Sequence, residues 1–216
     1  WGHRNAIVFG QRGRAPESIP AAASQYVMDF RTAQIRQQVM AVSRVQVGDV
    51  VWSPPREGIF KLNVHASWVL GESCGGIGGV IRDWKGEVIG GFAKQIRTCS
   101  RIDFAEALAI LHGLMFAKDV GLQDLSVEGD CLSVLIAIES SVEDLSELGH
   151  VFDHIKQCRD GFHSCDFGHV RRAANSVAHE IAVFARAVND EVFWLEDLPE
   201  RFLRSLDSDL ASLAGS

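Results

Sequence analysis

The strongest constraint in this sequence is a change of hydrophobic period near residue 100. Residues 60–67 (Phe-Lys-Leu-Asn-Val-His-Ala-Ser) alternate apolar and polar side chains, as expected for a strand with one packed face. A glycine-rich segment at 74–82 and a returning segment at 87–96 also suit strands, and Asp-Trp-Lys-Gly forms a turn between them. From Phe104 the apolar residues fall at helical spacing instead. The sequence therefore predicts a three-stranded antiparallel meander followed by a helix.

The second half of the chain alternates strand and helix patterns. The first helix ends at Gly121, a short strand covers 125–128, and helices follow at 132–138 and at about 144–159. A strand at 164–170 precedes a last helix. We place Asp130 and Asn175 at helix N-caps, because their short side chains can accept hydrogen bonds from a first helical turn. This order predicts an α/β fold, with crossover strands added to the meander and helices on both faces of the sheet.

The glycines at 75–79 also invite a phosphate-binding interpretation. They lie inside a predicted strand with no helix after it, whereas a nucleotide loop needs a helix N-terminus directly behind its glycines. We therefore interpret them as strand glycines.

The flanking segments divide the chain into four parts. Residues 1–23 are a short apolar piece and a Gly/Pro/Arg-rich linker, and residues 24–58 are an amphipathic helix with a Pro/Gly-rich lead-in. Residues 59–188 carry the strand and helix signals, and residues 189–216 are predicted to be an acidic tail with one loose helix. Because the chain begins at Trp1 without a methionine, we expect a fragment or a processed piece.

Charge and cysteine usage restrict the possible partners. The net charge is -7, and a protein this acidic is a poor electrostatic partner for phosphate backbones. The five cysteines form no C-x-x-C pair, so we expect reduced thiols in an intracellular protein, in the nucleus or the cytoplasm. There is no apolar run long enough to predict a membrane span.

Several motifs together resemble the type 1 ribonuclease H domain. The likeness is nearest to plant ribonuclease H-like domains downstream of non-LTR retroelement reverse transcriptases, and it covers about residues 59–188. Residues 1–23 resemble the end of the zinc-binding region that precedes such domains. The motifs are Lys-Leu-Asn-Val at 61–64, Gly-Gly-Val-Ile-Arg-Asp at 78–83, Ala-Glu-Ala-Leu-Ala at 105–109, Glu-Gly-Asp at 128–130 and Arg-Ala-Ala-Asn-Ser-Val-Ala-His at 172–179.

The resemblance implies a ribonuclease H-like five-stranded mixed sheet and a nuclease that holds two Mg²⁺ ions with four carboxylates. Glu106 matches the helix carboxylate, and Asp130 matches the carboxylate after the fourth strand. His65 falls where the first-strand aspartate is expected, and His179 falls where the last-helix aspartate is expected. His169 matches a histidine that helps to move protons or product in active relatives.

The two replacements leave several interpretations open. Taken alone, Glu106 is equally a solvated helix charge and Asp130 equally an N-cap. An imidazole has one nitrogen and no negative charge to offer, so His65 cannot bridge two Mg²⁺ ions. We expect Mg²⁺ or Mn²⁺ as cofactor if the domain is active, and otherwise a relic cluster without metal. A further alternative is one softer ion, Zn²⁺ or Mn²⁺, held by all four residues (Glu106, Asp130, His65 and His179).

Two functions follow from these observations. The first is an endonuclease that hydrolyses the RNA strand of RNA–DNA hybrids, with activity impaired by the histidines. The second is a catalytically inactive, retroelement-derived module that binds nucleic acid or protein. Residue 65 and the acidic charge both favour the second. Arg171 and Arg172 could contact a phosphate, although arginines on such a connection are more often solvated.

Overall fold

The computed structural model describes residues 51–216 except 70–71, 73, 98–100, 141–143 and 215–216. The predicted segment at 1–23 and the predicted helix within 24–46 lie outside these described residues. Within the described part, six strands, five α-helices and one 3₁₀-helix follow one another. In chain order they are β1 (Phe60–Ser67), β2 (Cys74–Arg82), β3 (Val88–Arg97), α3 (Ile102–Asp119), β4 (Asp124–Gly129), α4 (Leu132–Glu139), α5 (Glu147–Arg159), β5 (Ser164–His169), η1 (Arg172–Asn175), α6 (Ser176–Ala185), β6 (Glu191–Leu195) and α7 (Glu200–Ala214).

The strands form one mixed sheet in the order β5-β4-β1-β2-β3-β6. The meander of β1, β2 and β3 is antiparallel, whereas β4 pairs parallel to β1 and β5 pairs parallel to β4. The parallel pairings require crossovers, which the helices after β3 and β4 provide. The α/β fold predicted from the sequence is confirmed, including the mixture of parallel and antiparallel strands.

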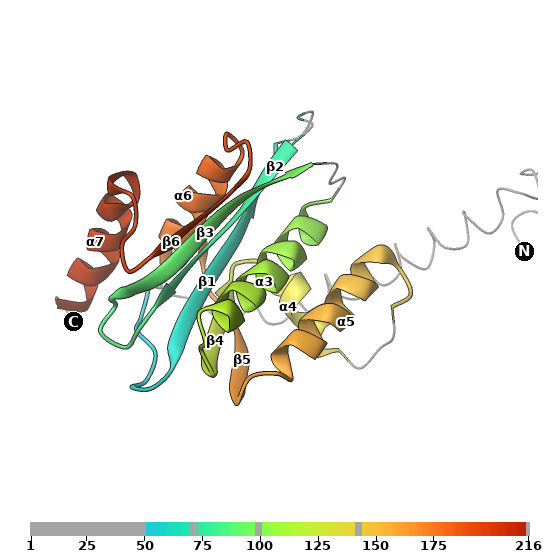
Figure 1. Ribbon diagram of the computed structural model, residues 1–216, viewed down its shortest axis with the longest axis horizontal. Coiled ribbons are helices and arrows are strands. Elements are labelled where there is room, and N and C mark those ends of the chain that lie inside the picture. The colour runs from blue at the N-terminus through green and yellow to red at the C-terminus, as the bar shows by residue number, and fades with distance from the viewer. Residues whose placement is uncertain (1–50, 70–71, 73, 98–100, 141–143, 215–216) are drawn as a thin grey trace, which may run out of the picture. The chain divides into compact units, whose positions relative to one another are not determined.

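Helices cover both faces of the sheet (Figure 1). On one face, α3, α4 and α5 bury a large apolar cluster against β1 and β4. On the other face, α6 and α7 cover a second cluster. That second cluster contains Val80, Ala93, Val177, Ile181, Ala185, Leu198, Phe202 and Leu206.

The glycines of β2 set the distance between the sheet and α6. A Cβ atom added at Gly76 would lie 2.3 Å from the carbonyl oxygen of Ala182, and one added at Gly78 would lie 2.6 Å from Cγ2 of Ile181. Any side chain at these positions would therefore push α6 away from the sheet. The interpretation of these residues as strand glycines is confirmed, because β2 contains them.

The C-terminal segment differs from the acidic tail that the sequence predicted. β6 pairs antiparallel with β3 and makes the sheet six-stranded rather than five-stranded. Behind it, α7 buries Phe202 and Leu206 in the second core cluster. The acidic residues hid this amphipathic pattern, because Glu200 and Asp207 lie on the exposed side of α7 while Phe202 and Leu206 pack in the second core cluster.

One acidic residue of α7 is buried. Asp209 is 6% exposed and accepts a hydrogen bond of 2.7 Å from Nη1 of Arg82, which is 1% exposed. The guanidinium of Arg82 also lies 3.7 Å from the ring centroid of Trp52 and donates to Oδ1 of Asn63. This buried ion pair ties α7 to the sheet and to the segment before β1.

One predicted N-cap position is confirmed and the other is wrong by one residue. Asn175 is at the N-cap position of α6, although its side chain makes no capping hydrogen bond, whereas the N-cap of α4 is Cys131 rather than Asp130. The side chains of Asp130 and Asn175 make contacts with β1 instead. None of the described helices is long and apolar enough to cross a membrane.

Candidate functional site

Four of the residues singled out from the sequence meet where β1 and β4 run side by side. His65 lies near the end of β1, and Asp130 directly follows β4. Glu106 is in the second turn of α3, and His179 is in the first turn of α6. Because parallel neighbouring strands end at the same edge of a sheet, residues far apart in the sequence converge there.

The imidazole of His65 lies between two carboxylates. Its Nδ1 atom is 2.8 Å from Oδ1 of Asp130 and 3.4 Å from Oε1 of Glu106. Since ionised carboxylates only accept hydrogen bonds, the ring nitrogen facing Asp130 is the donor. The His65 residue is 7% exposed, so this contact is shielded from water.

Glu106 is held by the main chain of β1. Its Oε2 atom accepts a hydrogen bond of 3.1 Å from the backbone N–H of Ala66, which leaves Oε1 toward His65. Burial raises the pKa of Glu106 to about 9, and the nearby charge of Asp130 adds to this rise. The Ala66 N–H and the charge of Arg172 oppose the rise without cancelling it. The site therefore contains a carboxyl group that resists ionisation.

Asp130 has the opposite tendency. Burial alone would raise its pKa, but the hydrogen bond and the charge of His65 outweigh burial, so the pKa of Asp130 lies below its ordinary value. Asn175 lies beside it and donates from Nδ2 to the carbonyl oxygen of Val64 at 2.9 Å and, more weakly, to Oδ1 of Asp130 at 3.5 Å. Asn175 thus joins the start of α6 to both strands of the site.

His179 packs against His65 from α6. The two ring centroids are 4.8 Å apart and the rings meet edge to face. Nη2 of Arg172 lies 2.9 Å from Nε2 of His179 and 3.2 Å from its Nδ1, so the guanidinium covers this ring. Burial, His65 and Arg172 all lower the pKa of His179, which favours the neutral imidazole.

Three of the five predicted site residues form one cluster in the structure, and the other two lie beside it. His65, Glu106 and Asp130 can offer ligand atoms that all lie within 4.8 Å of one another, and His179 adjoins them through its ring contact with His65. His169 ends β5, where it pairs in register with Gly129, the residue before Asp130. This position puts the backbone of His169 at the same edge of the sheet.

Sequence reasoning missed three contributors to this site. Arg172 is exposed, as expected, but also contacts His179, and Asn175 is at the N-cap position, as expected, but its side chain donates to the carbonyl oxygen of Val64. The backbone N–H of Ala66 supports Glu106, and no side-chain pattern in the sequence signals a main-chain donor. The spacing of Arg172, Asn175 and His179, at intervals of three and four residues, was the available signal for a shared helical face.

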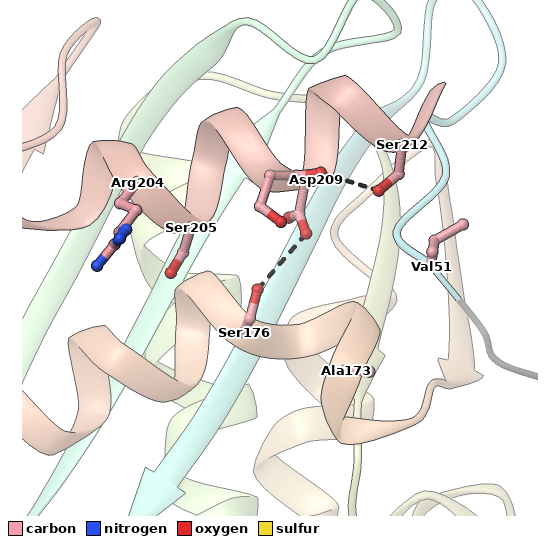
Figure 2. Close-up of a pocket in the computed structure, with 8 residues that line it drawn as sticks. Val51, Ala173, Ser176, Arg204, Ser205, Asp209 and Ser212 are labelled. Carbon is pink, nitrogen blue, oxygen red and sulfur yellow. Dashed lines mark hydrogen bonds between the residues drawn. The ribbon is translucent and has the colours of Figure 1, made fainter. Parts of the chain in front are cut away.

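A separate pocket of about 500 Å³ lies between α7 and the start of α6 (Figure 2). Two of its hydroxyl groups make hydrogen bonds within the protein: Ser176 donates to Asp209, and Ser205 donates to Glu180. Arg204 also lines the pocket, facing the same space as the serines. None of the predicted site residues lines it, so this pocket belongs to the α6–α7 contact and not to the histidine–carboxylate site.

Comparison with known protein families gives one match over more than half of the chain. The model described as reverse transcriptase-like matches residues 63–185, a range that includes His65, Glu106, Asp130 and His179. A curated protein of Arabidopsis thaliana that carries the provisional name of ribonuclease H protein is 24% identical over 190 residues, which is 86% of this chain. The chain spans 30% of that protein's length.

Solved structures share the fold. Ribonuclease H1 from the archaeon Halobacterium salinarum superposes with a TM-score of 0.55 at 20% identity, covering 59% of this chain and 96% of that one. LC11-RNase H1, solved in complex with an RNA/DNA hybrid, gives a TM-score of 0.53 at 20% identity, covering 60% of this chain and 99% of the other. Because these enzymes are almost fully covered, the remainder of this chain, with β6 and α7 beyond the matched family range, extends the common fold.

Proposed function

The chain belongs to the reverse transcriptase-like family of ribonuclease H domains, and on that premise we propose that it binds nucleic acid but hydrolyses the RNA strand of RNA–DNA hybrids poorly or not at all. The proposal places Glu106 and Asp130 as the remaining carboxylates of the ancestral metal site, with His65 and His179 in place of the other two. His169 is the auxiliary group at the same edge of the sheet.

One observation carries this proposal. The Nδ1 atom of His65 lies 2.8 Å from Asp130 and 3.4 Å from Glu106, so a side chain of the protein occupies the space between the two carboxylates. A carboxylate at position 65 would instead repel both and would need cations to stabilise the cluster. The histidine removes that need.

The residues present do not fit a pair of Mg²⁺ ions. Mg²⁺ requires oxygen ligands in near-octahedral geometry, and a two-ion site needs an anionic group that bridges both ions. Here the donor set is two carboxylates and two imidazoles, and neither imidazole can supply the anionic bridge. We therefore assign no hydrolytic step to Mg²⁺ in the unaltered chain.

Support for nucleic-acid binding comes from the fold and from a relative. LC11-RNase H1, which shares the fold, was solved with an RNA/DNA hybrid. Arg172 brings a positive charge to the edge of the site, beside His179. The net charge of -7 opposes tight binding to phosphate backbones, so we expect weak, salt-sensitive association with a hybrid.

A reversion experiment tests the proposal. The double variant His65→Asp/His179→Asp should raise Mg²⁺-dependent cleavage of a labelled RNA–DNA hybrid by roughly two orders of magnitude or more, the scale on which one transition-state-stabilising group acts. His163→Asp is the matched control, because His163 also makes a 2.8 Å contact from Nδ1 to an aspartate, Asp124, but lies on the surface. Hybrid binding of all variants is measured by fluorescence anisotropy without divalent metal.

The outcomes separate the parts of the proposal. Robust, EDTA-sensitive cleavage by the unaltered chain would refute impairment. A folded double variant that binds the hybrid and gains no activity would show that the two histidines are not what limits hydrolysis. Loss of hybrid binding in every variant would refute the nucleic-acid part.

A second candidate function is a protein-binding module. The edge strand β6 exposes Phe193 by 49% and Leu195 by 61%, and the acidic charge suits a basic protein surface better than a phosphate backbone. Failure to bind any hybrid at low salt would favour this candidate.

A further inference from the structure

We propose that His65, Glu106 and Asp130 form a binding site for one Zn²⁺ ion, with His179 as a fourth ligand. This inference rests on the proposed function in one respect, since it takes the same residues to have lost the two-Mg²⁺ arrangement. Zn²⁺ accepts imidazole nitrogen and carboxylate oxygen together in tetrahedral sites, which is the donor set found here.

The distances between the ligand atoms suit a single small ion. With bonds of about 2.0–2.2 Å, two ligand atoms of a tetrahedral Zn²⁺ site lie roughly 3.3–3.5 Å apart. Nδ1 of His65 and Oε1 of Glu106 are already 3.4 Å apart. The 2.8 Å between His65 and Asp130 is a hydrogen bond, and it would have to widen by about half an ångström as the ion replaces the shared proton.

Groups behind the ligands hold two of them in position. The backbone N–H of Ala66 donates to Oε2 of Glu106 and so directs the other oxygen toward His65. Asn175, which is 1% exposed, contacts Asp130 from the start of α6. Hydrogen bonds of this kind, one shell outside the ligands, orient metal ligands and reduce the cost of assembling the site. The Oδ1 atom of Asn175 has no hydrogen-bond partner among the described residues and is a further buried oxygen beside the site.

To bind Zn²⁺, His179 would have to lose its contact with the guanidinium of Arg172. Its ring lies 4.8 Å from the ring of His65, but the guanidinium of Arg172 covers both of its nitrogens. A guanidinium repels a metal ion at the same place. Because it can only donate, it also competes with the ion for the one ring nitrogen of a neutral imidazole that has a free lone pair. Removing Arg172 should therefore strengthen Zn²⁺ binding, whereas removing His179 should weaken it.

Calorimetric titration of the full chain with ZnCl₂ under reducing conditions tests the site. We expect one Zn²⁺ per chain, a loss of affinity of at least tenfold in His65→Ala, a smaller loss in His179→Ala, and a several-fold gain in Arg172→Gln. His163→Ala is the matched control, since this surface histidine has a single aspartate beside it, and it should leave the affinity unchanged. Cys131→Ser, next to Asp130 in sequence, controls for binding through a thiol and should also leave it unchanged.

Each result has a definite meaning. Absence of saturable Zn²⁺ binding, or equal binding by the unaltered chain and His65→Ala, would overturn the proposal. Loss of binding in Cys131→Ser would assign the ion to a thiol and would overturn it as well. An unchanged affinity in both His179→Ala and Arg172→Gln would remove His179 from the ligand set.

Thermal unfolding with and without Zn²⁺ provides a second measurement. An ion that binds only the folded chain raises its melting temperature. The unaltered chain should show this rise, and a folded His65→Ala variant should not. Neither measurement depends on hybrid cleavage, so a failed Zn²⁺ site and a failed nuclease assignment would be recognised separately.

Discussion

At the scale of single residues, Glu106 couples the site to the stability of the fold. It is 6% exposed, and burial is the main cause that raises its pKa to about 9. In the unfolded chain a glutamate ionises near pH 4.5, so between these two pH values the folded state holds a proton that the unfolded state has released. The contribution of Glu106 to stability is therefore complete below pH 4.5 and is lost as the pH rises toward about 9.

Replacing this one group should change the pH dependence of folding. In Glu106→Gln, which keeps the shape and removes the ionisation, we expect the free energy of unfolding at pH 8 to rise by several kcal/mol, with little change at pH 4. Urea unfolding in EDTA at several pH values measures this, with the exposed Glu87→Gln as control. If Glu106→Gln and the unaltered chain had the same slope between pH 5 and 8, the carboxyl group would have to ionise freely in the folded state.

The sequence predicted correctly which residues lie together, but it did not predict the hydrogen bonds between them. The family pattern indicated that positions 65, 106, 130 and 179 carry the site, and the structure brings these side chains together. The hydrogen bond between His65 and Asp130 was not predictable, because an aspartate before a helical pattern is equally a cap. Whether Asp130 caps a helix or pairs with His65 depends on a strand 65 residues away in sequence.

At the scale of elements, α7 is attached through a buried charge as well as through apolar contacts. Asp209 is the partner of Arg82, and both are almost inaccessible to water. Burial lowers the pKa of Arg82, and Asp209 opposes this effect. Such a pair adds little net stability compared with apolar residues, but removing one partner leaves the other charge buried without its counterion.

We expect Asp209→Ala to destabilise the domain by about 3–5 kcal/mol. The second substitution Arg82→Met should recover part of this loss, because it removes the charge left without its partner. Asp207→Ala, on the exposed side of the same helix, is the matched control and should change the free energy by less than about 0.5 kcal/mol. Chemical denaturation of these three variants and of the unaltered chain gives these values. A loss in Asp209→Ala no larger than in Asp207→Ala would mean that α7 does not depend on this ion pair.

The acidic composition of residues 191–216 led to the prediction of a tail, where the structure has the strand β6 and the helix α7. Residues 191–216 carry six acidic residues, which favoured the interpretation of a tail. Phe202, Leu206 and Leu210 recur every four residues within α7, and this spacing is the signal for an apolar helix face. A count of charges ignores where they lie on the helix, whereas the spacing of apolar residues does not.

At the scale of the whole molecule, the sheet separates two apolar cores of unequal size. The larger core lies under α3, α4 and α5, and the smaller one depends on α6 and α7 together. Three residues after position 188 (Leu198, Phe202 and Leu206) belong to the smaller core. The domain boundary at 188 expected from the family likeness therefore divides a core that the structure shows as continuous.

A chain that ends at Val188 should fail to unfold cooperatively, because Val80, Ala93 and the guanidinium of Arg82 lose the residues that cover them. Differential scanning calorimetry of this shortened chain tests the expectation. The control is a chain that begins at Gly48, which retains the compact unit Gly48–Ser216 and should melt in one transition. If the chain ending at Val188 melted in one transition within a few degrees of the control, β6 and α7 would be accessory to the fold.

The backbone pairing of β1 affects how the residue at position 65 can change during evolution. Position 65 is held opposite Gly78 by the strand ladder, whichever side chain it carries. Histidine and aspartate codons differ by a single nucleotide, so a lineage can exchange one for the other here in one mutational step while the ladder persists. The fold and the catalytic residue can therefore evolve separately at this position. A nuclease can give rise to descendants that keep the same sheet and have a different function.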